Sequence, residues 1–465
     1  YGLDITAGGA CATTINNTGY ITGNTAIEID SGALTLTGTG TINGTSYAIR
    51  TAGGDDDTIT VTGGYINGII DLYNGDDVLS INNAKMGFTL DRATATSAQY
   101  VSSETVSIAD VAPCTFAVNV APGTKNVQNN ENFLIVDAQD LTVDQSNFVI
   151  QNDNSLPMVT FSAVVSGAQI YLVANRDNAY YGANAGNRSL GTVLDDLANT
   201  SDGDMATIIG ALDDSGSPSN ADKLEPLADS GALNGSIESM TQYVNTVVDH
   251  VNGASGGSGI STGDDGLKNV GVWARGFGNY SHQDPRGSSN GYNSTLWGTA
   301  FGFDLEGLES FRYGLSGGFA QDFLRSKDNS GRTDIDSYQA SAYAMLDKGN
   351  YYLDGVLTFA YNQYDASRHI AIGVIDRTAN SSYNGQQYSV YTETGYDLDM
   401  GKLTLTPLIS FQYMHLRINP YTEKDAGAAD LEMKGQDYDM AQLGAGLKLA
   451  HSFNYRSVTF IPEVH

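Results

Sequence analysis

The strongest constraint on the fold is a two-residue alternation that runs from Val270 to His465. Between Trp297 and Asp304, large side chains at odd positions alternate with small or polar ones at even positions. Successive side chains of a β-strand point to opposite faces, so this period predicts strands with one bulky, apolar face and one small, polar face. The pattern recurs often enough to predict nine strands, at about 270–280, 297–304, 313–323, 335–347, 351–364, 386–399, 402–417, 436–450 and 456–465.

The contents of the two faces distinguish a membrane barrel from a soluble sandwich. Strands in soluble proteins usually have about 5–6 residues, whereas most of these runs are about twice as long. Both tryptophans and 17 of the 27 tyrosines fall in this region, and many lie near strand ends, as in interfacial aromatic girdles. The small, polar face suits a watery or plugged lumen. We therefore predict an antiparallel transmembrane β-barrel over 270–465, with a soluble sandwich as the alternative.

The N-terminal part contains a loose repeat of the form G-x-I-x-G. It occurs at 19–23, 40–44 and 64–68, and the central isoleucines are 21 and 24 residues apart. A period near 20 residues is typical of solenoids, in which each rung buries its face against its neighbours. We predict an all-β domain at 1–182, a right-handed parallel β-helix, with residues 84–182 as its closing part.

Between these two regions the apolar period changes to three and four residues, which predicts helices. Leu190 to Leu197 forms one such run, and Ile237 to Val251 forms a longer one. Asn234 or Ser236 could cap the second helix and Gly253 could end it, giving about 16 residues. A glycine- and serine-rich stretch from 252 to 266 follows, so 183–269 is predicted to be a helical and flexible linker.

Composition excludes several classes of protein. The formal net charge is −30, from 23 Lys and Arg against 53 Asp and Glu. Nucleic-acid binding depends on clustered Lys and Arg, so no nucleic-acid partner is expected. The sequence also lacks an apolar run near the ~18 residues that suggest a spanning helix, which excludes a helical membrane protein.

Several segments resemble the autotransporter family of type V secretion proteins. Those at 272–278, 298–304 and 312–319 are similar to the opening strands of its β-domain. Upstream, 132–138 and 169–173 resemble the end of a β-helical passenger that precedes the helical linker. The order of β-helix, linker and barrel also resembles the family plan. The family barrel has twelve strands, and this sequence begins without Met, so we expect the chain to be incomplete at both ends.

The resemblance implies a protein of a Gram-negative outer membrane that translocates its own passenger and displays it on the cell surface, with adhesion as the expected role of the passenger. The implied partners are outer-membrane lipid, the barrel assembly machinery and an unknown extracellular ligand. No catalytic activity is expected of the chain itself. Two alternatives remain open: a carrier of an enzymatic passenger head upstream of Tyr1, and a soluble extracellular β-solenoid that acts as a binding module.

Two acidic turns are the only metal candidates that the sequence offers. Segments 53–59 and 74–79 resemble the calcium-binding nonapeptide repeat without completing it, which makes Asp55, Asp57, Asp76 and Asp77 candidate calcium ligands. The structural alternative is a pair of stacked turns with solvated aspartates. No other cofactor is expected.

Three further patterns have structural explanations. Two G-x-S-x-G matches, at 253–257 and 314–318, lie in a linker and in mid-strand, where a nucleophile elbow does not form. Glu393 and Asn245 have the residue types that some relatives use to cleave their passenger inside the barrel, but nothing in their spacing supports this role, and a polar lumen lining is the better explanation. Cys11 and Cys114 are about five rungs apart, roughly 24 Å at ~4.8 Å per rung, so two separate thiols are expected.

Overall fold

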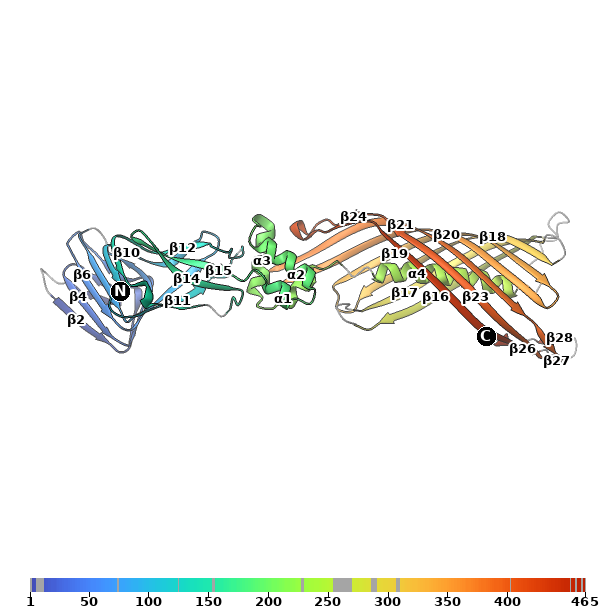
Figure 1. The fold of residues 1–465 in the computed structure, drawn as a ribbon, viewed down its shortest axis with the longest axis horizontal. Coiled ribbons are helices and arrows are strands. Elements are labelled where there is room, and N and C mark those ends of the chain that lie inside the picture. The colour runs from blue at the N-terminus through green and yellow to red at the C-terminus, as the bar shows by residue number, and fades with distance from the viewer. Residues whose placement is uncertain are drawn as a thin grey trace. The chain divides into compact units, whose positions relative to one another are not determined.

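The computed structural model describes residues 2–5, 12–72, 75–123, 125–152, 155–226, 230–253, 270–285, 291–306, 310–401, 403–451, 453–455, 458–460 and 463–464. The contacts divide the chain into two compact units. One contains residues 1–224 and 371–376, and the other contains 225–370 and 377–465. Each unit is described separately (Figure 1).

Two parallel ladders of strands build the first unit. In one ladder each strand pairs with the next but one in sequence, and Ile21, Ile42 and Ile66 occupy equivalent register positions. The G-x-I-x-G repeat therefore marks one position of a stacked structure. The ladder consists of β1 (Leu3–Ile5), β3 (Tyr20–Ile29), β5 (Thr41–Thr51), β7 (Tyr65–Asp71), β9 (Lys85–Asp91), β11 (Cys114–Val120) and β13 (Phe148–Gln151).

The second ladder alternates with the first along the chain. Leu34 aligns with Ile59, and Ile59 aligns with Leu79, so inward residues stack directly on one another. All three are buried in one continuous apolar core. The ladder consists of β2 (Ala12–Asn17), β4 (Ala33–Gly38), β6 (Thr58–Thr62), β8 (Val78–Asn82), β10 (Thr96–Ile108) and β12 (Asn132–Val143).

The parallel stacking ends in an antiparallel closure. Strand β15 (Gln169–Arg176) pairs antiparallel with both β12 and β14 (Val159–Ser166), and a short helix η1 (Gln145–Asn147) precedes β13. Phe133 and Phe161 meet edge to face with ring centroids 6.1 Å apart. Cys114 is a free, buried thiol in this core, and its burial raises the pKa of the thiol. Cys11 lies outside the described residues.

Short helices follow β15 and pack on the end of the stack. They are α1 (Tyr180–Asn184), α2 (Arg188–Ala198), α3 (Gly203–Asp214) and η2 (Pro218–Leu224). The Asn187 side chain caps α2 by accepting hydrogen bonds from the backbone N–H groups of Ser189 and Leu190. The sequence pattern predicted α2 but missed α1 and η2, which are short, and α3, which has 12 residues but carries no clear apolar period.

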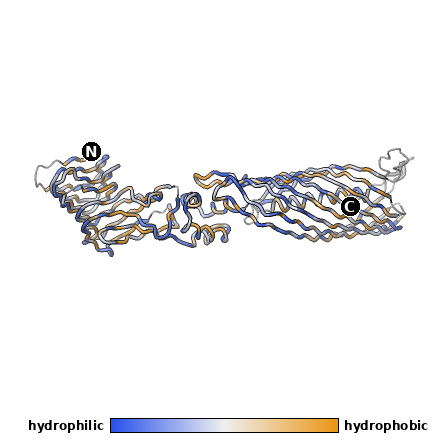
Figure 2. Tube along the Cα trace, turned by 90° about the horizontal axis from the view of Figure 1, so that it is seen from above, coloured by the Kyte–Doolittle hydropathy of each residue, from blue (hydrophilic) through white to orange (hydrophobic). Residues whose placement is uncertain are grey.

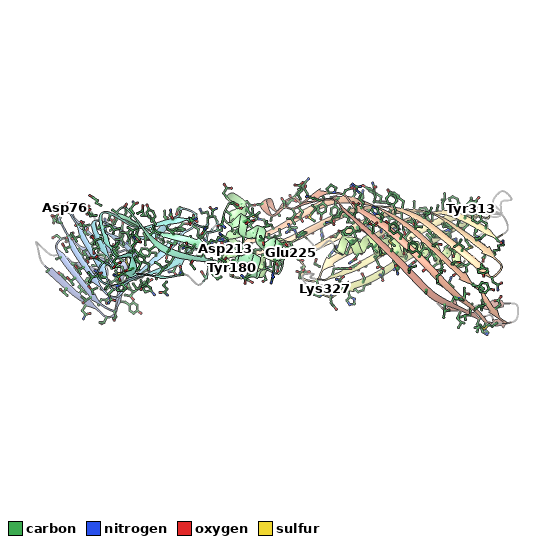
Figure 3. All side chains as sticks on the ribbon, viewed as in Figure 1. Asp76, Tyr180, Asp213, Glu225, Tyr313 and Lys327 are labelled. Carbon is green, nitrogen blue, oxygen red and sulfur yellow. The ribbon has the colours of Figure 1, made fainter. Side chains whose placement is uncertain are left out.

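A buried ion pair joins α3 to the last strand. The Arg176 guanidinium donates two hydrogen bonds to the Asp213 carboxylate, at 2.8 and 2.9 Å, and both side chains are 1% exposed. The Tyr181 hydroxyl donates a third bond to Asp213, at 2.8 Å. Burial, together with this carboxylate, raises the pKa of Tyr181 above its usual range. Figure 3 labels Asp213 among these helices. Nearby, buried Arg92 donates to Asp214 at 2.6 Å.

We predict that Asp213→Ala destabilises the first unit by about 3–5 kcal/mol, because it leaves the buried Arg176 charge without its partner. Hydrogen–deuterium exchange of β15 and α3 in the full chain should rise accordingly. Asp196, an exposed residue on α2, provides the control. Asp196→Ala should change the free energy of unfolding by less than about 0.5 kcal/mol and leave exchange nearly unchanged. Equal exchange in the two variants would contradict the prediction.

The second unit is an antiparallel sheet that curls around a long helix (Figure 1). Eight long strands, 14 to 22 residues each in the described ranges, pair in sequence order. They are β16 (Val270–Gln283), β17 (Tyr292–Glu306), β18 (Phe311–Ser326), β19 (Gly331–Lys348), β20 (Tyr351–Ile372), β21 (Ile375–Tyr396), β23 (Leu403–Ile418) and β26 (Gln436–His451). Short elements accompany them: β22 (Leu398–Met400), β24 (Tyr421–Thr422), η3 (Gly427–Ala429), β25 (Glu432–Met433), β27 (Phe453–Tyr455), β28 (Val458–Phe460) and β29 (Glu463–Val464).

The first eight predicted strands are confirmed, with corrected lengths. Strand β20 continues to Ile372 and β21 begins at Ile375, so the hairpin between them is much longer than the alternation indicated. Half of the ninth predicted strand, 456–465, falls on residues outside the described ranges. What is described there is short: β28, and β29, which pairs with the end of β26.

Helix α4 (Ser230–Gly253) lies against the inner face of this sheet and has 24 residues. The prediction of about 16 residues was wrong, because the proposed capping residues are inside the helix. The Ser236 hydroxyl donates to the Ala232 carbonyl one turn earlier, and Asn234 donates to the Tyr292 hydroxyl. Packing against the sheet therefore supports the first turns. The predicted linker from 254 to 266 lies outside the described residues. Among the helices that are described, none is long and apolar enough to cross a membrane.

Candidate functional site: the inner face of the sheet and its helix

The two faces of the sheet are inverted relative to a soluble protein. Phe301 and Leu357 are each 58% exposed on the outer face, whereas Asp354 and Asn362 are 1% exposed on the inner face. Figure 2 shows the resulting alternation of hydrophobic and hydrophilic positions along the strands, and Figure 3 labels Tyr313, another outward aromatic residue. An outward apolar surface with a polar interior is the arrangement of a transmembrane β-barrel. The predicted assignment of the two faces is confirmed.

Hydrogen bonds hold α4 to the polar inner face. The Gln339 amide donates to the Ser239 hydroxyl at 3.0 Å, and the hydroxyls of Tyr243 and Ser316 lie 2.9 Å apart. The hydroxyls of Ser236 and Tyr364 are 2.8 Å apart. A buried polar group that loses its partner costs about 1–3 kcal/mol, so these pairs fix the rotation and depth of the helix. Since Ser236, Ser239 and Tyr243 are three and four residues apart, this contact stripe could have been found in the sequence.

The C-terminal turn of α4 sits in an aromatic and charged cluster. The His250 ring stacks on Trp273 with centroids 4.4 Å apart, and its Nε2 lies 2.8 Å from Asp304 Oδ2. Trp273 donates to the Tyr343 hydroxyl, which in turn donates to Asp304. These contacts connect the helix to β16, β17 and β19.

Glycines on the inner face make room for the helix. A Cβ on Gly318 would come within 2.5 Å of the Tyr243 ring, whereas a Cβ on its neighbour Gly317 would meet only the outward Phe301 ring, at 3.3 Å. Below the tyrosine, Val244, Val247 and Val251 continue the apolar contact. The small residues on this face therefore leave the space that α4 occupies.

The luminal residues singled out in the sequence do not form a joint site. Glu393 is buried and accepts hydrogen bonds from Tyr352 at 2.8 Å, Tyr391 at 2.7 Å and Lys448 at 3.2 Å. Asn245 is exposed on α4, and no hydrogen bond joins it to Glu393 in the part of the chain that the structure describes. The Ser316 hydroxyl of one G-x-S-x-G match is bonded to Tyr243 in mid-strand, whereas Ser255 of the other lies outside the described residues.

The acidic turns form a ladder of carboxylates that accept backbone hydrogen bonds. Asp57 Oδ1 accepts from the N–H of Gly32 at 2.6 Å, and Asp77 Oδ1 accepts from the N–H of Asp57 at 2.7 Å. Glu104 accepts from the N–H of Asp77 at 3.4 Å. Asp57 and Asp77 are buried rather than solvated, which corrects the structural alternative considered above. Burial raises the pKa of Asp77 to about 6, and the charges of Asp57 and Glu104 add to the effect.

The four calcium candidates therefore have two different environments. Asp57 and Asp77 are buried in the ladder, whereas Asp55 and Asp76 are exposed beside it. Asp56, rather than Asp55, accepts a hydrogen bond from the N–H of Asp76, at 3.0 Å. Within the described residues, no group of three or more His, Cys, Asp or Glu side chains is arranged to hold a metal ion.

Comparison with known proteins identifies the class that this inverted sheet and its inner helix define. Residues 272–465 match the family model of the autotransporter beta-domain. This part of the chain therefore belongs to the autotransporter β-domain family, and it is an outer-membrane domain, with the preceding passenger segment exposed at the cell surface.

Relatives and solved structures cover different shares of the chain. Esterase EstA of Pseudomonas aeruginosa is 30% identical over 211 residues, 43% of this chain and 32% of that protein. Outer membrane protein B of Rickettsia japonica is 23% identical over 459 residues, 86% of this chain and 27% of that protein. The chain thus spans about a third or less of the length of these relatives. The translocator domain of autotransporter NalP from Neisseria meningitidis aligns with 47% of this chain and 72% of its own, at 18% identity and a TM-score of 0.37.

We predict that Gly318→Val weakens the seating of α4 while Gly317→Val does not. The new side chain on the inner face overlaps the Tyr243 ring, and overpacking of this kind costs about 1–3 kcal/mol. Hydrogen–deuterium exchange across residues 236–251 measures the effect. Similar exchange in both variants would show that the helix is not held by close contact at this point.

We also predict that the stability of the first unit falls as the pH rises from about 4 to 7. Asp77 binds its proton more tightly in the folded state, with a pKa of about 6, than when unfolded, at 3.8. The folded state is therefore favoured at low pH, and the advantage disappears as the pH passes through 6. Asp77→Asn keeps an acceptor oxygen and removes the charge, so it should raise stability at pH 7.5 by about 1 kcal/mol. Hydrogen exchange of β6 and β8 at both pH values is the measurement, and a variant that keeps the full pH dependence would contradict it.

Proposed function

We propose that this chain is an autotransporter that carries its own N-terminal β-helical passenger through the outer membrane and displays it on the cell surface. The observation that carries the proposal is α4, which is in sequence between the ladder unit and the sheet and is bonded to the polar inner face. A helix in this position is what remains when a chain has passed through the barrel that follows it.

The connections between strands give the orientation that the proposal needs. Outer-membrane barrels have short periplasmic turns and longer extracellular loops. Residues 307–310, 349–350 and 397–402 connect strands at one end of the sheet. The other end has the short connections 327–330 and 373–374 and the two longest ones, 284–291 and 419–435. Asn234 and Ser236, near the start of α4, contact the end with the longer connections. The chain N-terminal to α4 would thus emerge outside the cell.

The two stacked ladders favour a β-helical passenger. They also suggest that folding of the passenger outside the cell supplies the free energy for export. Each rung aligns with its neighbour in register, so a folded rung is a template for the next rung. A chain that emerges from its C-terminal end could begin to fold on the antiparallel closure formed by β12, β14 and β15. Each added rung buries residues such as Ile49 and Ile59, and sliding back would lose that burial.

Display rather than catalysis is the activity that we propose for these residues. The proposed partners are outer-membrane lipid around the outward aromatic residues, the barrel assembly machinery, and an extracellular ligand of the passenger, which could make it adhesive. The esterase and protease names among the relatives belong to those proteins.

Labelling of intact cells tests the orientation. We predict that a cysteine in place of Asp76, exposed on the first unit (Figure 3), reacts with a membrane-impermeant maleimide in intact cells. A cysteine in place of Asp399, exposed at the end opposite the two longest connections, should react only after the outer membrane is permeabilised. The unsubstituted chain gives the background. Labelling of the second variant alone in intact cells would overturn the proposal.

A further inference from the structure

The hairpin of β20 and β21 extends beyond its neighbours and forms a small structure of its own at the end with the longer connections. Strand β19 begins at Gly331, opposite Arg368, and β23 ends at Ile418, opposite Gly385. Residues 419–435, here called the return segment, then run back along β21. Asn380 and Lys424 exchange two backbone hydrogen bonds, at 2.8 and 2.9 Å.

A buried ion pair fixes the return segment to the hairpin. Arg368 donates to both carboxylate oxygens of Glu423, at 3.1 and 2.5 Å, and also to the Ala429 carbonyl at 2.7 Å. Both charged side chains are almost fully buried. Arg377 donates to the Ala426 carbonyl at 2.8 Å. A paired and hydrogen-bonded interior charge of this kind holds one arrangement, because breaking it costs several kcal/mol.

Three tyrosines join the return segment to the top of the sheet. The rings of Tyr364 and Tyr383 stack with centroids 4.7 Å apart, and those of Tyr383 and Tyr421 stack at 3.9 Å. Tyr364 also meets Ser236 of α4. The hairpin, the return segment and the helix are therefore packed as one body at this end.

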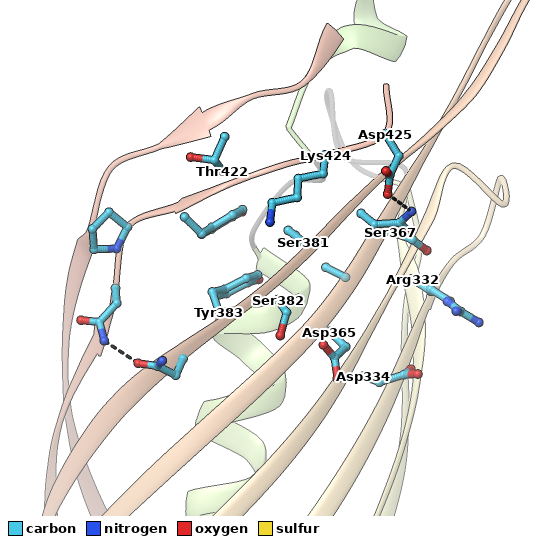
Figure 4. Close-up of a pocket in the computed structure, with 16 residues that line it drawn as sticks. Arg332, Asp334, Asp365, Ser367, Ser381, Ser382, Tyr383, Thr422, Lys424 and Asp425 are labelled. Atoms are coloured by element: carbon cyan, nitrogen blue, oxygen red, sulfur yellow. Dashed lines mark hydrogen bonds between the residues drawn. The ribbon is translucent and has the colours of Figure 1, made fainter. Parts of the chain in front are cut away.

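Between the hairpin and the return segment lies a cavity of about 610 Å³ (Figure 4). Figure 4 shows Lys424 extending from the return segment toward Tyr383, with Ser382 and Asp365 on the strands. The size is within the range of small-molecule sites, about 300–1,000 Å³, but the lining is far more polar than is usual for such sites. Its polar groups include Asp334, Asp365, Ser382, Thr422 and Lys424.

Several of these polar groups have unused hydrogen-bonding capacity. Arg325 holds Asp334 at 2.6 Å, and Asn380 holds Asp425 at 3.0 Å, so two carboxylates are fixed in place. In contrast, the side chains of Asp365, Ser382 and Thr422 make no hydrogen bond to another described residue. Carboxylates accept, hydroxyls both donate and accept, and the Lys424 ammonium donates, so the cavity presents both kinds of group at several points.

We propose that this cavity binds a saccharide. A polyhydroxylated ligand both donates and accepts at every hydroxyl, and the mixed lining matches that chemistry. An anionic ligand would face three carboxylates, of Asp334, Asp365 and Asp425, against the two cations Arg332 and Lys424. An apolar ligand would leave the carboxylates and hydroxyls unpaired. The saccharide comes either from a lipid-anchored glycan of the outer leaflet or from a free glycan outside the cell.

Isothermal titration of the full chain in detergent micelles tests the proposal. The probes are maltotriose, a neutral O-antigen polysaccharide released from lipopolysaccharide, and intact lipopolysaccharide that carries the same O-antigen. Asp365→Ala and Ser382→Ala should each weaken saccharide binding at least tenfold. Asp347, an exposed carboxylate at the opposite end of β19, gives the matched control Asp347→Ala, which should bind as the unsubstituted chain does. A heat-modifiable band on SDS gels shows that each variant is folded.

The outcomes separate the sources and the alternatives. Equal binding of the released O-antigen polysaccharide and intact lipopolysaccharide would support a lipid-anchored glycan, and binding of maltotriose alone would support a free one. Binding that requires the acyl chains, or that Asp365→Ala leaves unchanged, would overturn the proposal. So would binding of the polycation spermidine in place of all three saccharides, since the cavity would then be only a cluster of negative charge. A folded chain that binds no probe would overturn it while leaving the proposed display function untouched.

Discussion

The structure of the C-terminal unit depends on the polar inner face of its sheet. A sheet that turns its aromatic and aliphatic side chains outward leaves serines, glutamines and carboxylates in its interior, and these groups need partners. Helix α4 supplies them through Ser236, Ser239 and Tyr243. The inner glycines serve the same contact, because α4 can approach the strands closely only where they carry small side chains. The stacked His250–Trp273 pair holds the last turn of the helix against the sheet.

The N-terminal unit solves a different problem with the opposite chemistry. Its ladders bury a continuous core of Ile, Leu and Val, and each strand pairs with the strands before and after it in its ladder. The last strand of a ladder has no such neighbour, so this end must be covered. The antiparallel strands β14 and β15 stop the parallel pairing, and α1 to α3 cover the closure. Two buried arginines of the strand region, Arg92 and Arg176, form ion pairs with adjacent aspartates of α3 and so hold this helix on the closure. Covering the end of the parallel ladders in this way protects it from pairing with another chain.

How much the sequence predicts depends on whether a feature is periodic. The alternation around Trp297 predicted both faces of the sheet, and the spaced isoleucines 21, 42 and 66 marked positions that the register aligns. The early start of α4 was missed, since residues 230–236 include two glycines and three Ser or Asn residues and show no apolar period. The long hairpin was missed because residues 365–369 and 376–385 are mostly polar, and the return segment that stabilises them is distant in sequence. The burial of Asp77 depends on a neighbouring rung, which no local pattern contains.

The position of the two tryptophans has a practical consequence. Trp297 is 48% exposed on the outer face, where lipid or detergent surrounds it, whereas Trp273 is 8% exposed and lies against His250 of α4. The ladder unit contains no tryptophan at all. Tryptophan fluorescence, excited selectively over tyrosine, therefore does not report on the ladder unit. It reports two separate events in the β-domain: the contact of Trp297 with its surroundings, and the arrival of the helix beside Trp273. The assembly of the domain can thus be followed in time without any added label.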